Sequence, residues 1–334
     1  MPGLRIEQIP PGAALQDEGR PGYRRFGVTK GGAMDPYALA EGQALLQNKN
    51  GSAALEMASA GSRFRSLGCN LVVCTGAEMK LTVNGHRAPW RQTISLANDD
   101  YLEFGAFREG TYGYLHLPGG IQGPVLLGSR SAHAQAELGW RPQIGDRLDP
   151  VAAEWSDDTL RLPPPDYFSQ RTIRIMAGPQ TGLFREDDRR ALEEAEFTVT
   201  ATRNRVGVRL ESTHGPMDAE LGTSIVSDAI VAGDIQVAAD GIAVILLADC
   251  QPVGGYPRIA TVISADLHIF AQIPQDMKFR MRLVGLDRAV GELSELRREI
   301  ATLPTKLEPA LRDPRDISDL MSYSLIDGVV SGED

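Results

Sequence analysis

The sequence lacks the features that place a protein in a membrane. Its longest uninterrupted apolar run, Ile242 to Ala248, has seven residues, whereas a membrane-spanning helix is indicated by about 18 or more. The N-terminal segment from Met1 to Arg5 does not contain the apolar stretch of a signal peptide. We therefore expect a soluble, cytoplasmic protein that does not act at a membrane.

Cysteine and histidine are also scarce. The three cysteines, Cys69, Cys74 and Cys250, have no C-x-x-C spacing, and an odd number does not suggest a disulfide framework. The five histidines include no H-x-H or H-E-x-x-H pair that could converge on a metal ion. We expect small buried thiols and no bound metal.

The charge balance argues against polyanionic partners. The 34 basic and 44 acidic side chains give a net charge of −10, with no basic run that could neutralise a phosphate backbone. We therefore expect neither nucleic acid nor an anionic membrane as a partner. The 35 glycines and 21 prolines predict many turns, which favours β structure over a helical bundle.

Residues 1–150 are predicted to form an N-terminal β domain. Apolar and polar residues alternate over 79–83, and Asn84-Gly85 then supplies the positive φ angles of a hairpin turn. Further alternating runs at 93–96, 101–104 and 112–117 predict that a meander continues. One helix is predicted over 36–48, because Asp35 suits the N-cap and Pro36 suits the first helical position.

The remaining chain is predicted to form a linker, a second β unit and a tail. Residues 151–170 contain Asp157-Asp158 and Pro163-Pro164-Pro165, which favour an extended, solvated linker. Residues 171–285 are expected to form a barrel or closed sandwich, with helices at 185–195 and at 265–272, the second capped by Ser264. Its strands are expected at 171–176, 197–200, 207–211, 225–227, 235–237, 243–247, 259–263 and 279–284. Residues 286–334 are expected to hold a charged helix, 287–301, and a tail with the apolar strip 325–330. The helix and the strip either contact a partner or a second copy of the chain, or the tail is disordered.

Two glycine-rich segments carry arginines that suit an anionic ligand. The first covers residues 16–35 and contains Arg20; the second covers residues 118–133 and contains Arg130. Glycines let backbone amides approach a ligand, and an arginine fork suits a carboxylate. The competing interpretations are a structural loop in which Asp17 pairs with Arg20, and a salt bridge of Arg130 at a strand end. Neither segment contains a P-loop or a nucleophile elbow.

A third polar segment follows a core strand. The apolar run from Ile242 ends at Asp249, where burying a carboxylate is costly unless a cation or donors satisfy it. We expect the partners to be Arg258 and the backbone amides of Gly254 and Gly255, which would form either a structural knot or a polar pocket. Neutral donors and acceptors that suit an amide or urea-like substrate lie nearby in the sequence: Gln236, Gln251 and Tyr256.

Taken in order, several blocks resemble one family over roughly residues 3–285. They are Gln16-Asp17-x-Gly19-Arg20-x-Gly22, Gly32-Ala33-Met34-Asp35, Leu127-Gly128-Ser129-Arg130-Ser131, Gly178-Pro179-Gln180, Asp249-x-Gln251, Gly254-Gly255-Tyr256-Pro257 and Ile259-Ala260-Thr261-Val262-Ile263-Ser264-x-Asp266-Leu267. Together they resemble the biotin-dependent carboxyltransferase family, also called allophanate hydrolase subunit 2, the Kip inhibitor antagonist family or the 5-oxoprolinase C subunit. Its members are similar to the carboxyltransferase part of urea carboxylase.

The resemblance implies a mainly β fold with two barrel-like, cyclophilin-like domains, a few short helices and a C-terminal helical tail. It implies a partner that resembles the Kip inhibitor (subunit 1), and either a lactam-utilisation partner or a biotin carboxylase. ATP or carboxybiotin would come from those partners, with no cofactor bound covalently here. Ala77-Glu78-Met79-Lys80 is similar to a biotinylation hairpin, but Lys80 falls within an alternating strand rather than at a turn tip.

The leading hypothesis is a subunit of an ATP-dependent 5-oxoprolinase or urea carboxylase-like complex that acts on a lactam or urea-type substrate. In it, Asp249, Gln251 and Tyr256 are catalytic, and substrate is bound by Gln236, Arg258, Gly254, Gly255, Arg20 and Arg130. Pro252 and Val253 stand where the family usually has threonines, which removes two hydroxyls and one backbone donor. The alternative is therefore a non-catalytic regulatory protein that binds a Kip-inhibitor-like partner.

Overall fold

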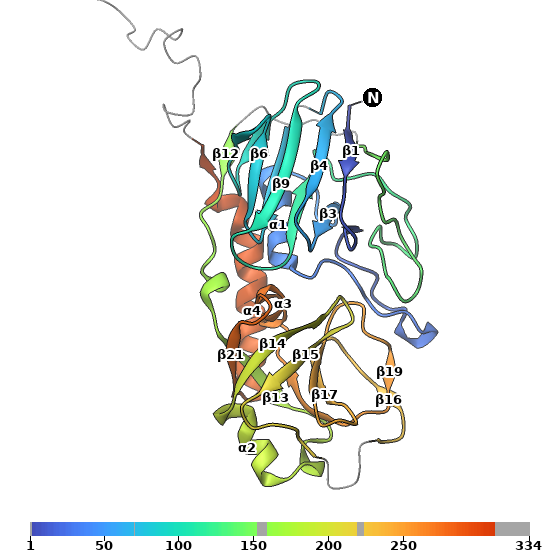
Figure 1. Ribbon diagram of the computed structural model, residues 1–334, viewed down its shortest axis with the longest axis vertical. Coiled ribbons are helices and arrows are strands. Elements are labelled where there is room, and N and C mark those ends of the chain that lie inside the picture. The colour runs from blue at the N-terminus through green and yellow to red at the C-terminus, as the bar shows by residue number, and fades with distance from the viewer. Residues whose placement is uncertain (1, 70, 152–158, 219–223, 311–334) are drawn as a thin grey trace, which may run out of the picture.

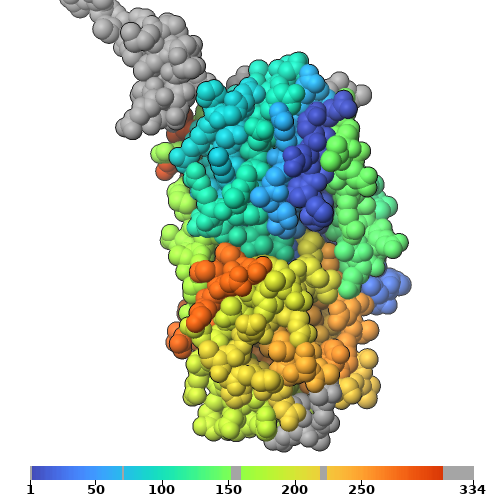
Figure 2. Space-filling model, in the orientation of Figure 1, coloured from blue at the N-terminus to red at the C-terminus, as the bar shows by residue number. Residues whose placement is uncertain are grey.

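The structure, a computed structural model, describes residues 2–69, 71–151, 159–218 and 224–310. Two β-rich lobes are stacked along its long axis (Figure 1). In the space-filling view the N-terminal lobe, blue to green, lies directly on the C-terminal lobe, yellow to orange (Figure 2). The candidate site lies where these two lobes meet.

The first lobe is a pair of open sheets. One has the order β11-β1-β4-β9-β6-β7 and the other the order β2-β3-β10-β5-β8. Leu4, Phe64 and Phe104 of the first sheet share one buried core with Leu55 and Leu115 of the second, so the lobe is a β-sandwich. The strands are β1 (Leu4–Gln8), β2 (Ala14–Gln16), β3 (Ala54–Met57), β4 (Ser62–Ser66), β5 (Leu71–Gly76), β6 (Met79–Val83), β7 (His86–Arg87), β8 (Thr93–Ser95), β9 (Tyr101–Phe107), β10 (Gly113–His116) and β11 (Arg147–Leu148).

Local pattern predicts the strands of this lobe but not their pairing. The Asn84-Gly85 hairpin is confirmed, because β6 pairs with β7 and both turn residues have positive φ. The continuous meander is wrong: β8 pairs with β5, and β10 lies between β3 and β5 in the other sheet. A barrel-like first domain is also wrong, because both of its sheets have free edges. Alternation predicts which face of a strand is buried, but it does not predict which other strand pairs with it.

The second lobe is a closed barrel, as predicted, with strands in the order β13-β20-β17-β18-β15-β14-β21. They are β13 (Thr172–Ala177), β14 (Glu196–Arg203), β15 (Gly207–Ser212), β17 (Asp234–Val237), β18 (Ala243–Leu246), β20 (Arg258–Val262) and β21 (Lys278–Leu283). Each matches a strand expected from the sequence. The strand expected at 225–227 is not formed; instead β16 (Asp228–Ala229) pairs with β19 (Val253–Gly254) on the barrel wall.

Helices cover the join between the lobes. Helix α1 (Pro36–Leu45) begins as predicted, since Asp35 Oδ1 accepts a hydrogen bond from the Ala38 amide and Pro36 is the first helical residue. Helix α4 (Leu286–Thr302) runs alongside both lobes (Figure 1). Its Ala289 packs in a buried cluster with Ile263 of the second lobe, and its Ile300 packs in another cluster with Val73 of the first. The other helical segments are α2 (Glu186–Glu194), α3 (Leu267–Gln272), and the 3-10 turns η1 (Arg24–Phe26), η2 (Asp166–Ser169), η3 (Thr181–Leu183) and η4 (Leu303–Lys306). Helix α3 begins after Asp266, not after the predicted cap Ser264.

The predicted linker and tail fall partly outside the described residues. This applies to 152–158 and to the tail from 311 onward, including the strip 325–330. The described end of the linker is structured: β12 (Leu160–Arg161) pairs with β22 (Glu308–Pro309), and η2 follows. None of the helices in the described ranges has the length and apolar character needed to cross a bilayer.

The packing of α1 can be tested at Gly42. A methyl group there would lie 2.3 Å from ring carbons of the buried His116. Replacing glycine by alanine in a helix gains up to about 1 kcal/mol, but overpacking costs about 1–3 kcal/mol. We expect Gly42→Ala to lower the free energy of unfolding by about 1–2 kcal/mol in urea denaturation.

The matched control is Gly291→Ala, within α4, where a methyl group would meet no atom within 4 Å. This substitution should raise stability by up to about 1 kcal/mol. Equal effects of the two substitutions would contradict the close packing of α1 on His116.

Candidate functional site

A groove of about 1470 Å³ lies between the lobes. Its walls come from the glycine-rich segment 17–36, one face of α1, the barrel loops near 231 and 248, and one face of α4. Three cationic side chains of the first segment, Arg20, Arg24 and Lys30, line it together with Asp17 and Glu18. This end of the groove therefore suits an anionic group.

Asp17 joins the two glycine-rich segments identified in the sequence. Its Oδ1 accepts hydrogen bonds from the Gly19 amide at 2.8 Å and from the hydroxyls of Ser129 and Ser131, each at 2.5 Å. Its Oδ2 accepts from the Arg130 amide at 2.6 Å. These contacts hold two loops, more than a hundred residues apart in the chain, against each other.

Arg20 is held by backbone carbonyls. Its Nη2 donates to the Ser131 carbonyl and its Nε to the Leu126 carbonyl at 3.4 Å. The side chain is only 1% exposed, and its Nη1 is buried without a hydrogen-bond partner among the described residues. The expected alternative, an ion pair with Asp17, is not found within the described ranges. The Nη1 group of this groove-lining cation is thus buried without a partner among the described residues.

Gly31 lies where three functional side chains converge. A methyl group on its Cα would be 3.3 Å from the His133 ring, 3.4 Å from Asp249 Oδ1 and 3.7 Å from Arg20 Nη1. The φ angle of Gly31 is +60°, in the left-handed region that glycine adopts without strain. The backbone can therefore pass directly over Arg20 and Asp249 only because residue 31 has no side chain.

Asp249 is not the open carboxylate that the sequence suggested. It is fully buried, and both of its oxygens are paired with Arg205: Oδ2 with Nε and Oδ1 with Nη2, each at 2.9 Å. The prediction that Arg258 is the partner of Asp249 is wrong, because Arg258 pairs with Asp228. Because both oxygens are buried and paired with Arg205, the open polar pocket expected around Asp249 is not formed, and this geometry does not support its expected catalytic role.

Arg205 connects the barrel to the first lobe. It lies in the β14–β15 hairpin turn, which Asn204 stabilises by accepting hydrogen bonds from the amides of Val206 and Gly207. From there Nη1 pairs with Glu56 Oε1 at 2.5 Å, and Nη2 also donates to the Gly32 carbonyl at 2.6 Å. Burial opposes its charge, but the nearby carboxylates of Glu56 and Asp249 raise the pKa of Arg205 above its ordinary value.

The polar chain continues from Glu56 to the start of α1. Glu56 Oε2 accepts from the Met34 amide at 2.8 Å and from the Tyr114 hydroxyl at 2.7 Å, and the Tyr114 oxygen accepts from the Asp35 amide. Asp35 Oδ2 in turn accepts from Gln272 of α3 at 2.8 Å. The helix cap predicted from sequence is thus also a contact between the lobes.

His133 has a defined tautomer. Its Nδ1 accepts from the Ala136 amide at 3.3 Å, so Nε2 carries the proton and donates to Thr29 Oγ1 at 2.8 Å. The Thr29 hydroxyl donates onward to the Cys250 carbonyl at 2.8 Å. Burial lowers the pKa of His133, although Asp249 acts in the opposite direction. The ring is therefore neutral near pH 7 and ties the glycine-rich loop to the barrel.

A second cluster contains the other predicted binding residues. Arg258 pairs with Asp228 and bonds to the Ala229 carbonyl and, through Nε at 2.9 Å, to Gln180. Gln236 is 3% exposed and its Nε2 has no partner among the described residues; a methyl group at Gly254 would lie 2.7 Å from that atom. Within the described ranges no hydrogen bond or ion pair links this cluster to the one around Asp249.

Other candidates take different positions. Arg130 is fixed beside the glycine-rich loop by its backbone, but its side chain does not line the groove. Gly255 accepts a hydrogen bond from the Ile225 amide through its carbonyl. Gln251 is half-buried and Tyr256 is 42% exposed; their catalytic roles remain predictions.

Several residues of the site were not singled out from the sequence: Arg205, Glu56, Tyr114, Thr29 and His133. Of these, only His133 and Thr29 belong to a glycine-rich segment that was already a candidate. Arg205 and Glu56 had no local signal, because their partners come from distant strands.

The fold matches part of a larger protein of known structure. The crystal structure of the Kluyveromyces lactis urea amidolyase superposes with a TM-score of 0.80 at 22% identity, covering 93% of this chain and 21% of that one. The chain therefore spans about a fifth of that larger protein. This likeness establishes the two-lobed fold.

Residues 26–283 match the family described as carboxyltransferase domain, subdomain A and B, and the chain belongs to that family. Among curated relatives, the 5-oxoprolinase C subunit of Haemophilus influenzae is 31% identical over 283 residues, 83% of this chain and 90% of the relative. The protein of the same name from Escherichia coli is 27% identical over 299 residues, 88% of this chain and 95% of the relative. The resemblance found in the sequence motifs is confirmed.

The Arg205 ion-pair cluster makes a strong prediction for stability. Its side chain is 13% exposed, and those of Glu56 and Asp249 are each 1% exposed. Removing one member of a buried ion pair costs about 3–5 kcal/mol, because the remaining charge is buried without a partner. We expect Arg205→Met to lower the free energy of unfolding by about 3 kcal/mol or more in denaturant titrations.

Arg209→Met is the matched control. Arg209 lies four residues along the chain and pairs with Asp240 in a partly exposed position. Surface pairs contribute about 1 kcal/mol or less, so this variant should be nearly as stable as the wild type. A small effect at both positions would refute the structural importance assigned to Arg205.

Proposed function

We propose that this chain is a subunit of an ATP-dependent 5-oxoprolinase complex and that it binds the lactam substrate in the groove. Two curated relatives that it covers almost from end to end are named as the C subunit of 5-oxoprolinase. That name supports companion subunits as partners, among them the Kip-inhibitor-like subunit 1 and a lactam-utilisation subunit. A urea carboxylase-like reaction is the related alternative for the same groove.

One observation supports the choice of substrate site. Arg20 lines the groove, and its buried Nη1 has no hydrogen-bond partner among the described residues. The lactam 5-oxoproline carries a carboxylate, and guanidinium–carboxylate hydrogen bonds are among the strong ones. Arg24 and Lys30 line the same end and add positive potential. Asp17 and the Ser131 carbonyl fix the loop, so Arg20 is ordered before substrate arrives.

The remaining residues would position the loop over the substrate. Arg205 holds the Gly32 carbonyl, and His133 holds Thr29, so both ends of the 29–32 turn are tied to buried groups. Gly31 lets the backbone pass close to Arg20 Nη1, since a methyl group there would lie 3.7 Å from that atom. The turn is thus preorganised to leave one donor free.

ATP or carboxybiotin would be bound by partner subunits. The sequence has no G-x-x-x-x-G-K-[ST] motif for cradling phosphates, so ATP would be held by another subunit. In a carboxyltransferase reaction the same would apply to carboxybiotin, because Lys80 lies within β6 and not at a hairpin tip. The groove volume exceeds the requirement of a small lactam, which leaves room for a group delivered by a partner.

The test is substrate selectivity in the reconstituted complex. The chain, co-expressed with its companion subunits, is assayed for ATP hydrolysis with 5-oxoproline and with 2-pyrrolidinone, which lacks the carboxylate. A charge-assisted hydrogen bond contributes about 1.5–3 kcal/mol, so the wild type should favour 5-oxoproline about tenfold or more in kcat/KM. Arg20→Met should raise KM for 5-oxoproline by about tenfold and lose most of that selectivity.

Arg190→Met, at an exposed position on α2, serves as the control and should leave both rates unchanged. Retained selectivity in Arg20→Met and Arg20→Lys would remove Arg20 from the binding site. Tight binding to the subunit 1 partner without lactam- or urea-dependent turnover in the wild type would instead establish the regulatory alternative.

A further inference from the structure

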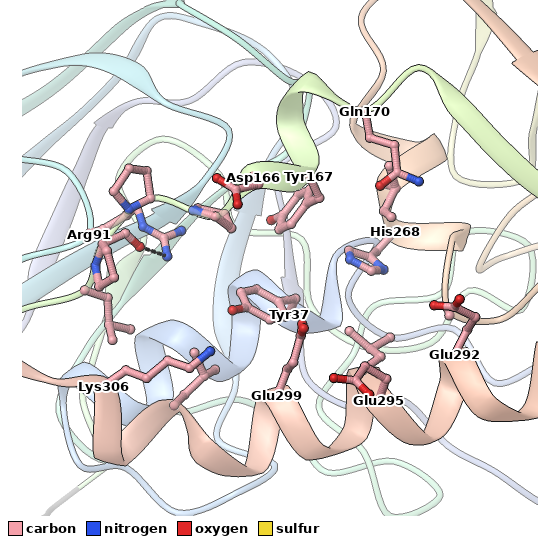
Figure 3. A pocket seen from close by; sticks show the side chains of 18 of the residues that line it. Tyr37, Arg91, Asp166, Tyr167, Gln170, His268, Glu292, Glu295, Glu299 and Lys306 are labelled. Carbon is pink, nitrogen blue, oxygen red and sulfur yellow. Dashed lines mark hydrogen bonds between the residues drawn. The ribbon is translucent and has the colours of Figure 1, made fainter.

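A second cavity, of about 400 Å³, lies on the side of the molecule formed by α4 and the chain that links the lobes. Its floor is built from Tyr37 of α1, Tyr167 of η2 and His268 of α3 (Figure 3). The Tyr37 and His268 rings stack with centroids 6.3 Å apart and planes 10° apart, and Tyr167 meets His268 edge-on at 5.0 Å. The volume is within the range of small-molecule sites.

Two buried polar atoms on residues lining this cavity have no hydrogen-bond partner among the described residues. One is Nδ1 of His268, a side chain that is 4% exposed and that Figure 3 shows turned from α3 toward Tyr37. The other is Nε of Arg91, which is 6% exposed. The remaining nitrogens of Arg91 are committed to Glu41 and to the Pro163 carbonyl. Unpaired buried polar atoms are costly, so each is a position where a ligand gains by binding.

Charged side chains of both signs line the cavity. Figure 3 shows Arg91 and Lys306 on one side, and Glu292 and Glu295 with His268 on the other. Glu292 is neutralised by Arg174 and Arg288, and Glu295 by Arg298. These two carboxylates are therefore not available to a ligand.

Three charged groups lining the cavity form no ion pair within the described ranges: Lys306, Asp166 and Glu299. Figure 3 shows Glu299 beside the Tyr37 ring and Asp166 on the opposite wall, near Tyr167. Among the described residues, the cavity thus combines one cation without an ion pair and two such carboxylates, of which Glu299 lies beside an aromatic ring.

We propose that this cavity binds a small zwitterion, a molecule with an ammonium group and a carboxylate joined by a short chain. The ammonium group is held by the Glu299 carboxylate beside the faces of Tyr37 and His268, where an aromatic ring attracts a cation. The carboxylate is held by Lys306 and by the free N–H of Arg91. The ligand class is thus that of ω-amino acids and related amino acids.

Burial favours this assignment for His268. It lowers the pKa of the ring, against the opposing influence of the carboxylates of Asp35, Asp266 and Glu299 and of a hydrogen bond to the Ala265 backbone. A neutral imidazole does not repel the ammonium group, and in the tautomer protonated at Nε2 its Nδ1 serves as the acceptor.

The inference does not depend on the proposed lactam chemistry, because it concerns binding at a different cavity. His268 and Leu296 nevertheless line both this cavity and the groove, so the two share a wall. A ligand that orders His268 would therefore also alter one face of the groove.

The test is isothermal titration calorimetry on the full chain with glycine, γ-aminobutyrate and 6-aminohexanoate. Hexanoate and hexylamine are the single-charge controls. At least one zwitterion should bind at least tenfold more tightly than either control, and the chain length of that zwitterion reports the spacing of the two ends. Equal or stronger binding of hexanoate or hexylamine, or no binding of any zwitterion, would overturn the proposal.

Variants locate the binding. Lys306→Met and Glu299→Gln alter exposed side chains that should not affect folding, and each should weaken the best zwitterion at least fivefold. His268→Phe keeps the ring stacking but removes the nitrogens, and it should also weaken binding of that zwitterion at least fivefold. Arg190→Met, on the exposed face of α2, is the control and should bind as the wild type does. Unchanged affinity in both Lys306→Met and Glu299→Gln would place the ligand elsewhere, whatever the fate of His268→Phe.

Discussion

The two lobes share one buried cation. Asp249 belongs to the barrel and Glu56 to the sandwich, and neither carboxylate is accessible to water. Both are compensated by Arg205, which also bonds the Gly32 carbonyl of the glycine-rich loop. Because an unpaired buried charge is far more costly than a paired one, the relative placement of barrel, sandwich and loop is an electrostatic requirement.

That requirement explains why the site residues lie in loops and yet are ordered. Arg20 has no ion pair of its own among the described residues, but the loop that carries it is held by Asp17 on one side and by Arg205 on the other. Because this loop is fixed at both ends, its own carbonyl groups cannot move to pair with the unsatisfied donor of Arg20. Rigid support from distant strands, together with glycines that admit close approach, is what turns a polar loop into a binding surface.

The sequence predicts local structure well and long-range partners poorly. The seven barrel strands follow from short alternating or apolar runs, and the start of α1 follows from Asp35 and Pro36, since each signal lies within a few residues of its effect. The pairing of β8 and β10 does not follow, because the same alternation suits either sheet. The sequence correctly predicts that Asp249 needs a cation, but it points to Arg258, nine residues further on, and not to Arg205. Only the fold brings the hairpin turn at Asn204 toward the first lobe.

The closure of the barrel has a consequence for how the chain is made. Its first strand, β13, completes the ring through a parallel pairing with its last, β21, in which Thr172 lies opposite Arg280. About a hundred residues must leave the ribosome before this seam can form, so the nascent barrel remains an open sheet with two exposed edges for most of its synthesis. Pairings of this kind form slowly. During that interval the growing polypeptide is most in need of chaperone protection, and α4, which follows β21 directly, can seal the structure only afterwards.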